Sequence, residues 1–237
     1  MTLTWSKARI ATSAALAVWA ALFWYIIILD RLPLYLAART TWLAPVGAIT
    51  LTLAALGRLA SARTSVPEPL SKKQSINLVT LALPALLIMA LPPIALGSFA
   101  IERRGPSVSG GYVTVSGRQI GEGDLSLMDV FELSYDNELH RLADRAGTTS
   151  SFTGFVSREP DSAAGEFTLN RFIISCCPGD AISVQLRVVG APPGQFEADD
   201  WVRVSGGIYP VGEQLVVDAS EVIQVPRPAH PYLSGRN

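Results

Sequence analysis

Two adjacent cysteines stand in a segment whose residue types could do chemistry. Cys176 and Cys177 are the only cysteines of the 237-residue chain, and Asp180 follows them. Adjacent cysteines seldom form a disulfide with each other, because the ring they close is strained. Three interpretations stay open: the cysteines are small apolar core residues on opposite faces of a strand, their thiolates hold a soft metal ion with Asp180 or a histidine nearby, or the pair opens and closes as a redox couple.

Other residues that could do chemistry are sparse. The only histidines are His140 and His230, and neither has a spacing typical of a zinc site. The sequence lacks the GxSxG, GxxxxGK[ST] and HExxH motifs of nucleophile elbows, phosphate loops and zinc proteases. The sequence therefore predicts a protein that is not an enzyme, and it identifies no cofactor.

The elements that must position the cysteines are strands. Five runs rich in Val, Ile, Phe or Thr follow one another near the carboxyl end, and Gly or Pro stands in each gap. The runs are Ser151–Ser157, Glu166–Ser175, Ala181–Val189, Trp201–Tyr209 and Gln214–Val225. Such a series without a long helix predicts an all-β domain over residues 149–237, a small barrel of the OB type. We expect Trp201 to pack into this barrel.

A connecting segment, residues 105–148, precedes the barrel. A short strand is expected at 112–115, and the pattern over 124–135 is ambiguous between helix and strand. A helix is expected over 136–146, with Asp136 as its N-cap and Gly147 at its end.

The amino-terminal part, residues 1–104, has a different composition. It carries ten Lys/Arg against three Asp/Glu, a net charge of +7, whereas the remainder has a net charge of −8. Three long apolar runs, the second with Arg39 near its start, predict transmembrane spans at about 10–29, 34–57 and 76–101. Pro84 lies in the third span, where it either kinks the helix or belongs to a face that packs on a partner. The acidic carboxyl-terminal part has the wrong charge for nucleic acid, which we exclude as a partner.

Loop charges predict the orientation of the spans. Six basic residues lie on the side of the amino terminus and the second loop, and four lie on the other side. The positive-inside rule then favours a multi-pass protein of the plasma membrane with a cytoplasmic amino terminus and an extracytoplasmic barrel.

Three motifs in the carboxyl-terminal third carry a resemblance to a known family. The segments RFIISCCPGDA, DDWVRVSGGI and VPRPAHPYL contain a double cysteine followed by Asp-Ala, a Trp-Val-x-Val-x-Gly strand and a Pro-x-x-Pro-Tyr ending. In this respect the chain resembles a bacterial family of permease-subunit membrane proteins that have a β domain of unknown function. The positions that match are Arg171, Cys176, Cys177, Asp180, Ala181, Trp201, Val202, Val204, Gly206, Pro228, Pro231 and Tyr232.

The resemblance implies a partner. Members of that family accompany a larger multi-spanning permease of a kind related to organoarsenical exporters, which implies that this chain is one component of a two-protein transport system. Spans that lack internal charges agree with this, because transporters mark their routes with ionisable groups. We therefore expect an accessory subunit whose β domain binds substrate or gates access. The alternative is a membrane-anchored metal-binding or redox protein that uses Cys176 and Cys177.

Overall fold

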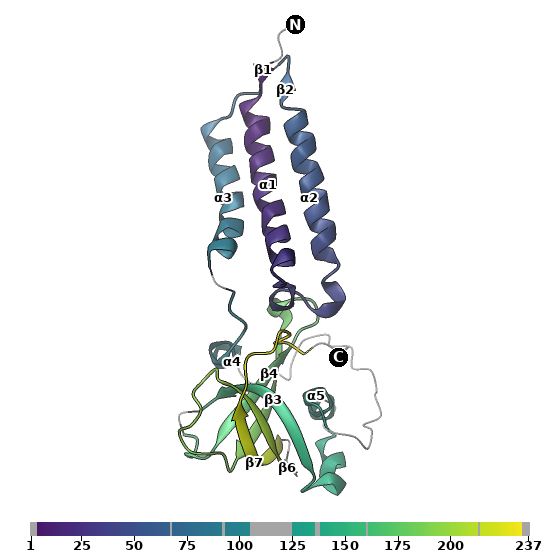
Figure 1. Cartoon of the computed structure of the whole chain (residues 1–237), viewed down its shortest axis with the longest axis vertical. Coiled ribbons are helices and arrows are strands. Elements are labelled where there is room, and N and C mark those ends of the chain that lie inside the picture. The colour runs from purple at the N-terminus through teal and green to yellow at the C-terminus, as the bar shows by residue number, and fades with distance from the viewer. Residues whose placement is uncertain are drawn as a thin grey trace. The chain divides into compact units, whose positions relative to one another are not determined.

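The computed structural model divides the chain into two compact units, Met1–Ile94 and Ala95–Asn237 (Figure 1). It describes residues 4–66, 68–91, 93–104, 125–135, 138–159, 161–212 and 214–233. The boundary between the units falls after Ile94, not after residue 104 as expected, because residues 95–104 pack with the barrel.

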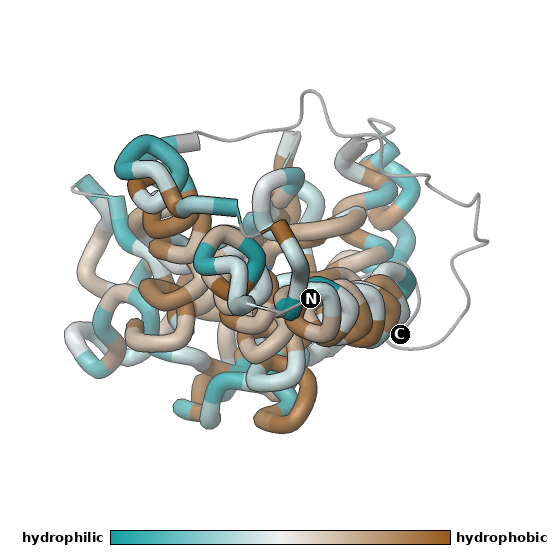
Figure 2. The backbone as a smooth tube through the Cα atoms, turned by 90° about the horizontal axis from the view of Figure 1, so that it is seen from above, coloured by the Kyte–Doolittle hydropathy of each residue, from teal (hydrophilic) through white to brown (hydrophobic). Residues whose placement is uncertain are grey.

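Three helices make up most of the first unit. They are α1 (Lys7–Ile28), α2 (Leu43–Ala60) and α3 (Lys72–Ala90), and each is long and apolar enough to cross a membrane. Figure 2 shows the backbone coloured by hydropathy, with brown marking the apolar residues that recur along these helices. The predicted combination of three membrane helices with a small β-barrel is confirmed.

The second and third helices differ from their expected bounds. Two short 3₁₀ helices occupy Leu32–Leu34 and Ala38–Thr40, so that the regular part of the second span begins at Leu43. The third helix begins before residue 76, because Ser71 caps it by accepting a hydrogen bond from the Gln74 N–H at 3.2 Å.

The expected continuous helix over 76–101 is two helices in the structure. The first, α3, continues through Pro84 and ends at Ala90, and α4 (Ser98–Arg104) follows after a break. Two successive prolines follow Leu91 in the sequence. A proline has no backbone N–H and disfavours helical geometry in the residue before it, which accounts for the break.

The helices pack through α1, which lies between α2 and α3 (Figure 1). The buried Ser13 hydroxyl donates to the Ala55 carbonyl on α2 at 2.7 Å, and the Trp19 indole N–H donates to the Leu81 carbonyl on α3 at 3.0 Å. These bonds satisfy polar groups that a bilayer could not solvate. By contrast, α2 and α3 have little contact with each other.

A small polar cap closes one end of the helices. The two-residue strands β1 (Thr4–Trp5) and β2 (Arg63–Thr64) pair antiparallel. Next to them, the Arg9 guanidinium forms an ion pair with Glu68 at 2.9 Å and donates to the Ser61 carbonyl at 2.7 Å. The cap joins the start of α1 to the loop between α2 and α3, and so it fixes which helix ends lie together.

Five strands of the second unit close a barrel. They are β3 (Thr149–Ser157), β4 (Phe167–Ile173), β5 (Ile182–Val189), β6 (Trp201–Val211) and β7 (Gln214–Gln224). Their order around the barrel is β3-β4-β5-β7-β6, with β3 pairing with β6 and only the β5–β7 pair parallel. All five predicted strands are present, and the five-stranded barrel is of the expected OB-like kind.

Side chains alternate between the barrel interior and its surface. Along β5, Val184, Leu186 and Val188 are buried, whereas the residues between them face outward. This is the period-2 pattern that predicted the strand. Inward-facing residues of the other strands, such as Val202 and Val204 on β6, complete the core.

Two helical segments pack on this core. The ambiguous run before the barrel is helical, α5 (Leu127–Tyr135), and a 3₁₀ helix spans Leu139–Arg145 within the expected 136–146 segment. Gly147 ends it with a φ of +82°, a conformation that glycine adopts without strain. The expected strand at 112–115 and the expected N-cap Asp136 lie outside the described residues.

Candidate functional site

The two cysteines lie in a turn just beyond the end of β4. Strand pairing stops at Ile173, and a short 3₁₀ helix, Pro178–Asp180, follows the cysteines. Cys176 is exposed and Cys177 is half-buried, and neither forms a disulfide. Of the three interpretations left open, the one in which a cysteine fills the barrel core is therefore wrong. We call residues 175–180 the dithiol turn.

Asp180 holds the dithiol turn in shape. Its carboxylate accepts hydrogen bonds from the backbone N–H groups of Ser175 at 2.9 Å and Cys176 at 2.6 Å. Partial burial by itself raises the pKa of Asp180, but hydrogen bonds from the Cys176 side chain and from the backbone of residues 175–177 together lower it. Asp180, which was predicted as a possible ligand, is therefore ionised and stabilises the turn through these hydrogen bonds.

The same contact affects the Cys176 thiol. Its hydrogen bond to Asp180, followed by that to Cys177, raises the pKa of Cys176 to about 11. Compared with an ordinary thiol, this lowers the thiolate fraction at neutral pH about 100-fold. A thiol in this state is a poor nucleophile at neutral pH.

We expect Asp180→Asn to speed the alkylation of Cys176 by iodoacetamide several-fold at pH 7.5. The substitution removes the carboxylate that stabilises the protonated thiol, and the gain in thiolate exceeds the loss of intrinsic nucleophilicity that accompanies a lower pKa. The rate is measured by mass spectrometry in a Cys177→Ser background, with Asp161→Asn as the control. Equal rates in the two Asp variants would contradict the role assigned to Asp180.

The carboxyl-terminal segment lies along the barrel beside this turn. Leu233 donates to the Phe172 carbonyl at 2.8 Å and accepts from the Ile174 N–H at 3.1 Å, so that it pairs with the end of β4. The Arg171 guanidinium donates to the carbonyls of His230 at 2.8 Å and Pro231 at 3.2 Å. We call residues 225–233 the tail strap, and Arg171 is its main side-chain anchor.

An aromatic cluster lies next to this anchor. The rings of Phe155 and Phe172 stack with centroids 5.7 Å apart, and both residues are buried although they are not part of the barrel core. Trp201 packs against Phe155 at 5.9 Å and lies beneath the Arg171 guanidinium at 5.7 Å. Trp201 therefore packs beside the strap, half-buried, and not inside the barrel as expected.

The strap also contacts the start of the second unit. The buried Tyr232 hydroxyl accepts a hydrogen bond from the Leu96 N–H at 3.0 Å. Close by in the sequence, the Ser98 hydroxyl donates to the Asp199 carboxylate at 3.0 Å. These bonds join the segment before α4 to the barrel and explain why the second unit begins at Ala95.

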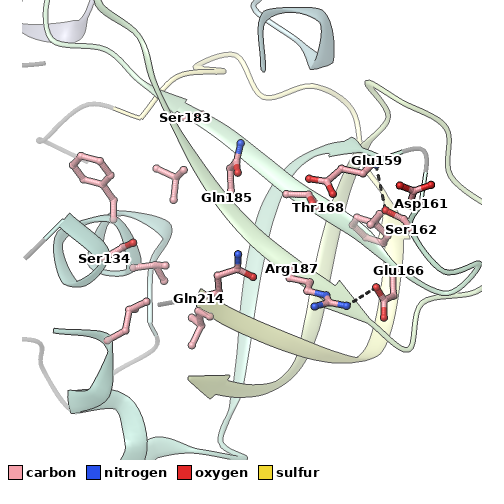
Figure 3. Close-up of a pocket in the computed structure, with 16 residues that line it drawn as sticks. Ser134, Glu159, Asp161, Ser162, Glu166, Thr168, Ser183, Gln185, Arg187 and Gln214 are labelled. Atoms are coloured by element: carbon pink, nitrogen blue, oxygen red, sulfur yellow. Dashed lines mark hydrogen bonds and ion pairs between the residues drawn. The ribbon is translucent and has the colours of Figure 1, made fainter. Parts of the chain in front are cut away.

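A polar groove of about 540 Å³ lies across the outer face of β4 and β5 (Figure 3). The strands contribute Thr168, Ser183 and Gln185, and α5 borders the groove on the opposite side from the loop that holds Glu159 and Asp161 (Figure 3). β4 and β5 are the second and third strands of the barrel, the face with which OB folds bind oligonucleotides and oligosaccharides.

Negative charge dominates the groove. Arg187 forms an ion pair with Glu166 at 2.8 Å, which leaves the carboxylates of Glu159 and Asp161 without an ion-pair partner among the described residues. A groove of this charge disfavours phosphates and suits a neutral polar or cationic solute.

The structure brings most predicted site residues to one end of the barrel. Arg171, Trp201, Pro231 and Tyr232 meet at the tail strap, and the dithiol turn follows directly on β4. Gly206 lies apart, at an irregularity in the β6–β7 pairing, and Pro228 lies earlier in the strap. The groove was not predicted, although the alternating polar residues over Ser183–Val189 were its signal.

Comparison with protein families identifies part of the chain. Residues 126–233 match the model of the DUF1980 C-terminal domain, a domain of unknown function. Every residue that carries the resemblance to the permease-subunit family lies inside this match. The search of curated proteins finds no match.

Proposed function

We propose that the chain is a non-enzymatic accessory subunit of a two-component membrane permease. Its three helices dock on a multi-spanning partner, and its barrel binds the transported solute in the β4–β5 groove. The observation that carries the proposal is the arrangement of the helices, in which α2 and α3 both pack on α1 and hardly on each other.

Such an arrangement encloses no route for a polar solute. The stretches 10–28, 43–57 and 74–90 contain no Asp, Glu, Lys or Arg, whereas transport pathways are marked by ionisable groups inside the membrane. The polar side chains of Ser13 and Trp19 are already bonded between helices. The chain therefore needs a partner to supply the pathway.

The exposed faces of the outer helices offer surface for that partner. On α2, Val46, Ile49 and Leu53 lie on one face and are each at least half exposed. On α3, Ile76 and Val79 also lie on one face and are more than half exposed. Apolar faces of this kind pack against the helices of a partner or against lipid.

The orientation belongs to the same proposal. The polar cap gathers Arg9 and Arg63 at one end of the helices, and Arg58 also lies near Glu68 there, at 3.9 Å. Basic residues are retained on the cytoplasmic side. We therefore assign the cap to the cytoplasm of a plasma-membrane protein and the barrel to the outside, with no nucleic-acid partner.

Affinity purification of the tagged full chain from native membranes tests the proposal. We expect a multi-spanning membrane protein to co-purify in a fixed ratio after mild detergent extraction. Recovery of the chain alone from several mild detergents, even after cross-linking in the membrane, would contradict it.

A groove variant separates solute binding from docking. We expect Thr168→Arg combined with Gln185→Arg to fill the groove and neutralise its negative charge, and so to abolish complementation of a strain that lacks the protein. The partner should still co-purify, because these residues lie on the barrel. The matched control is Arg203→Lys, an exposed position on β6 outside the groove lining. Full complementation by the double variant would remove the groove from the proposed function.

A further inference from the structure

The dithiol turn has a geometry suited to a metal ion. The two Sγ atoms lie 3.7 Å apart and are not joined in a disulfide. Two thiolates on one tetrahedral ion, with metal–sulfur bonds of about 2.3 Å, lie about 3.8 Å apart. The sulfur atoms therefore already have the spacing that chelation of a single ion requires.

Backbone hydrogen bonds on both sides of the two cysteines hold this spacing. Asp180 receives the N–H groups of Ser175 and Cys176, and its own N–H donates to the Cys177 carbonyl at 3.0 Å. On the preceding side, Leu233 of the tail strap fixes Ile174 by a backbone hydrogen bond. A site organised before binding loses less conformational entropy when the ion binds.

The turn is also open, which limits how tightly it can hold an ion. Cys176 is exposed, and no group of three or more His, Cys, Asp or Glu suited to a metal occurs in the described ranges of the chain. Two thiolates therefore supply half of a tetrahedral shell, and solvent or a second molecule supplies the rest. Such a site exchanges its ion readily, unlike the closed four-ligand sites of structural zinc.

We propose that Cys176 and Cys177 form an exposed, exchangeable site for a thiophilic divalent metal ion. Thiolate ligands select soft and borderline ions over magnesium and calcium. Binding converts two thiols and one ion into a bis-thiolate chelate and releases two protons, without any oxidant. The inference is independent of the permease partnership, since it concerns a different part of the barrel from the groove.

Thiols bind metal ions as thiolates, so an ion must displace their protons and binding depends on pH. With two protons released, the apparent affinity should rise by up to about 100-fold per pH unit below the thiol pKa values. An adventitious surface carboxylate site would not show this dependence.

The test uses the full chain in detergent, reduced, stripped of metal and titrated with Cd²⁺ alone. We expect one Cd²⁺ per chain with a thiolate-to-cadmium charge-transfer band, release of two protons, and displacement by Zn²⁺. Cys176→Ser and Cys177→Ser should each weaken binding at least about tenfold, since even residues that only support metal ligands cost about 10–100-fold. The double variant should lose the band altogether.

Two controls keep the outcome clear. Asp161→Asn in the groove should bind Cd²⁺ as the wild type does, and the double Cys variant should unfold at the wild-type temperature, because its substitutions are outside the core. Absence of the band in the wild type, its persistence in the double variant, or isolation of the pair as a disulfide that reductant does not open would each overturn the proposal. None of these results bears on whether a partner co-purifies.

Discussion

Replacement of Gly206 by alanine is expected to destabilise the barrel by about 2–3 kcal/mol. Gly206 lies at the irregularity where the register of β6 against β7 shifts. A Cβ atom there would overlap the Asp218 carbonyl oxygen and lie 2.9 Å from the Ala219 Cα. These are backbone atoms of a paired strand, and they cannot move aside without breaking the pairing that closes the barrel.

Gly207→Ala is the matched control for this prediction. A Cβ atom at the neighbouring position would meet the Tyr209 side chain, at 3.2 Å, and a side chain can turn away. Thermal unfolding of the purified full chain, followed by near-ultraviolet circular dichroism, measures both variants. We expect a lower midpoint for Gly206→Ala and a near-native midpoint for Gly207→Ala. Equal midpoints would show that the strands accommodate the added methyl group.

Gly206 also shows what the sequence could and could not predict. The Trp-Val-x-Val-x-Gly motif identified Gly206 as a position of interest, and the alternation over Trp201–Ser205 predicted the strand before it. Neither pattern explains why position 206 is a glycine. The explanation is that the Asp218 backbone on β7 approaches so closely that it leaves no room for a Cβ atom. Periodicity describes one strand at a time, whereas the close contact exists only between two.

The position of the dithiol turn could not be predicted for the same physical reason. The run Glu166–Ser175 is strand-like, and only one of the three interpretations of the cysteines had them continue its alternation. In the structure, pairing with β5 ends at Ile173, and Ile174 pairs instead with Leu233 of the strap. A partner that lies 59 residues further along the chain leaves no trace in the local pattern.

The barrel was predictable because burial on one face imposes a period of two on each strand. The membrane helices were predictable because each is an apolar run long enough to cross a bilayer. The groove is harder to predict, since it combines the outward residues of β5 with a loop and a helix from elsewhere in the chain. The Leu96–Tyr232 hydrogen bond joins residues 136 positions apart and was not foreseen at all. It shows that the strap belongs to the barrel surface and has a structural role beyond any contact with a partner.

Arg171→Ala is expected to release the tail strap and to cost about 2–3 kcal/mol of stability. The guanidinium donates to two strap carbonyls and lies over Trp201, and burial lowers the pKa of Arg171 without removing its charge at neutral pH. Its loss leaves the carbonyls of His230 and Pro231 without their donor and uncovers part of the Trp201 ring.

Hydrogen exchange measured by mass spectrometry follows this release directly. In the Arg171→Ala protein, the amides of Leu233 and Ile174 should exchange faster, because both depend on the strap staying in place. Arg171→Lys should restore little of the protection, since one ammonium group cannot reproduce the planar fork. The control is Arg187→Ala, whose partly exposed ion pair with Glu166 contributes at most about 1 kcal/mol. If the Leu233 amide exchanges equally fast in the Arg171→Ala and Arg187→Ala proteins, the strap is held by its backbone pairing alone.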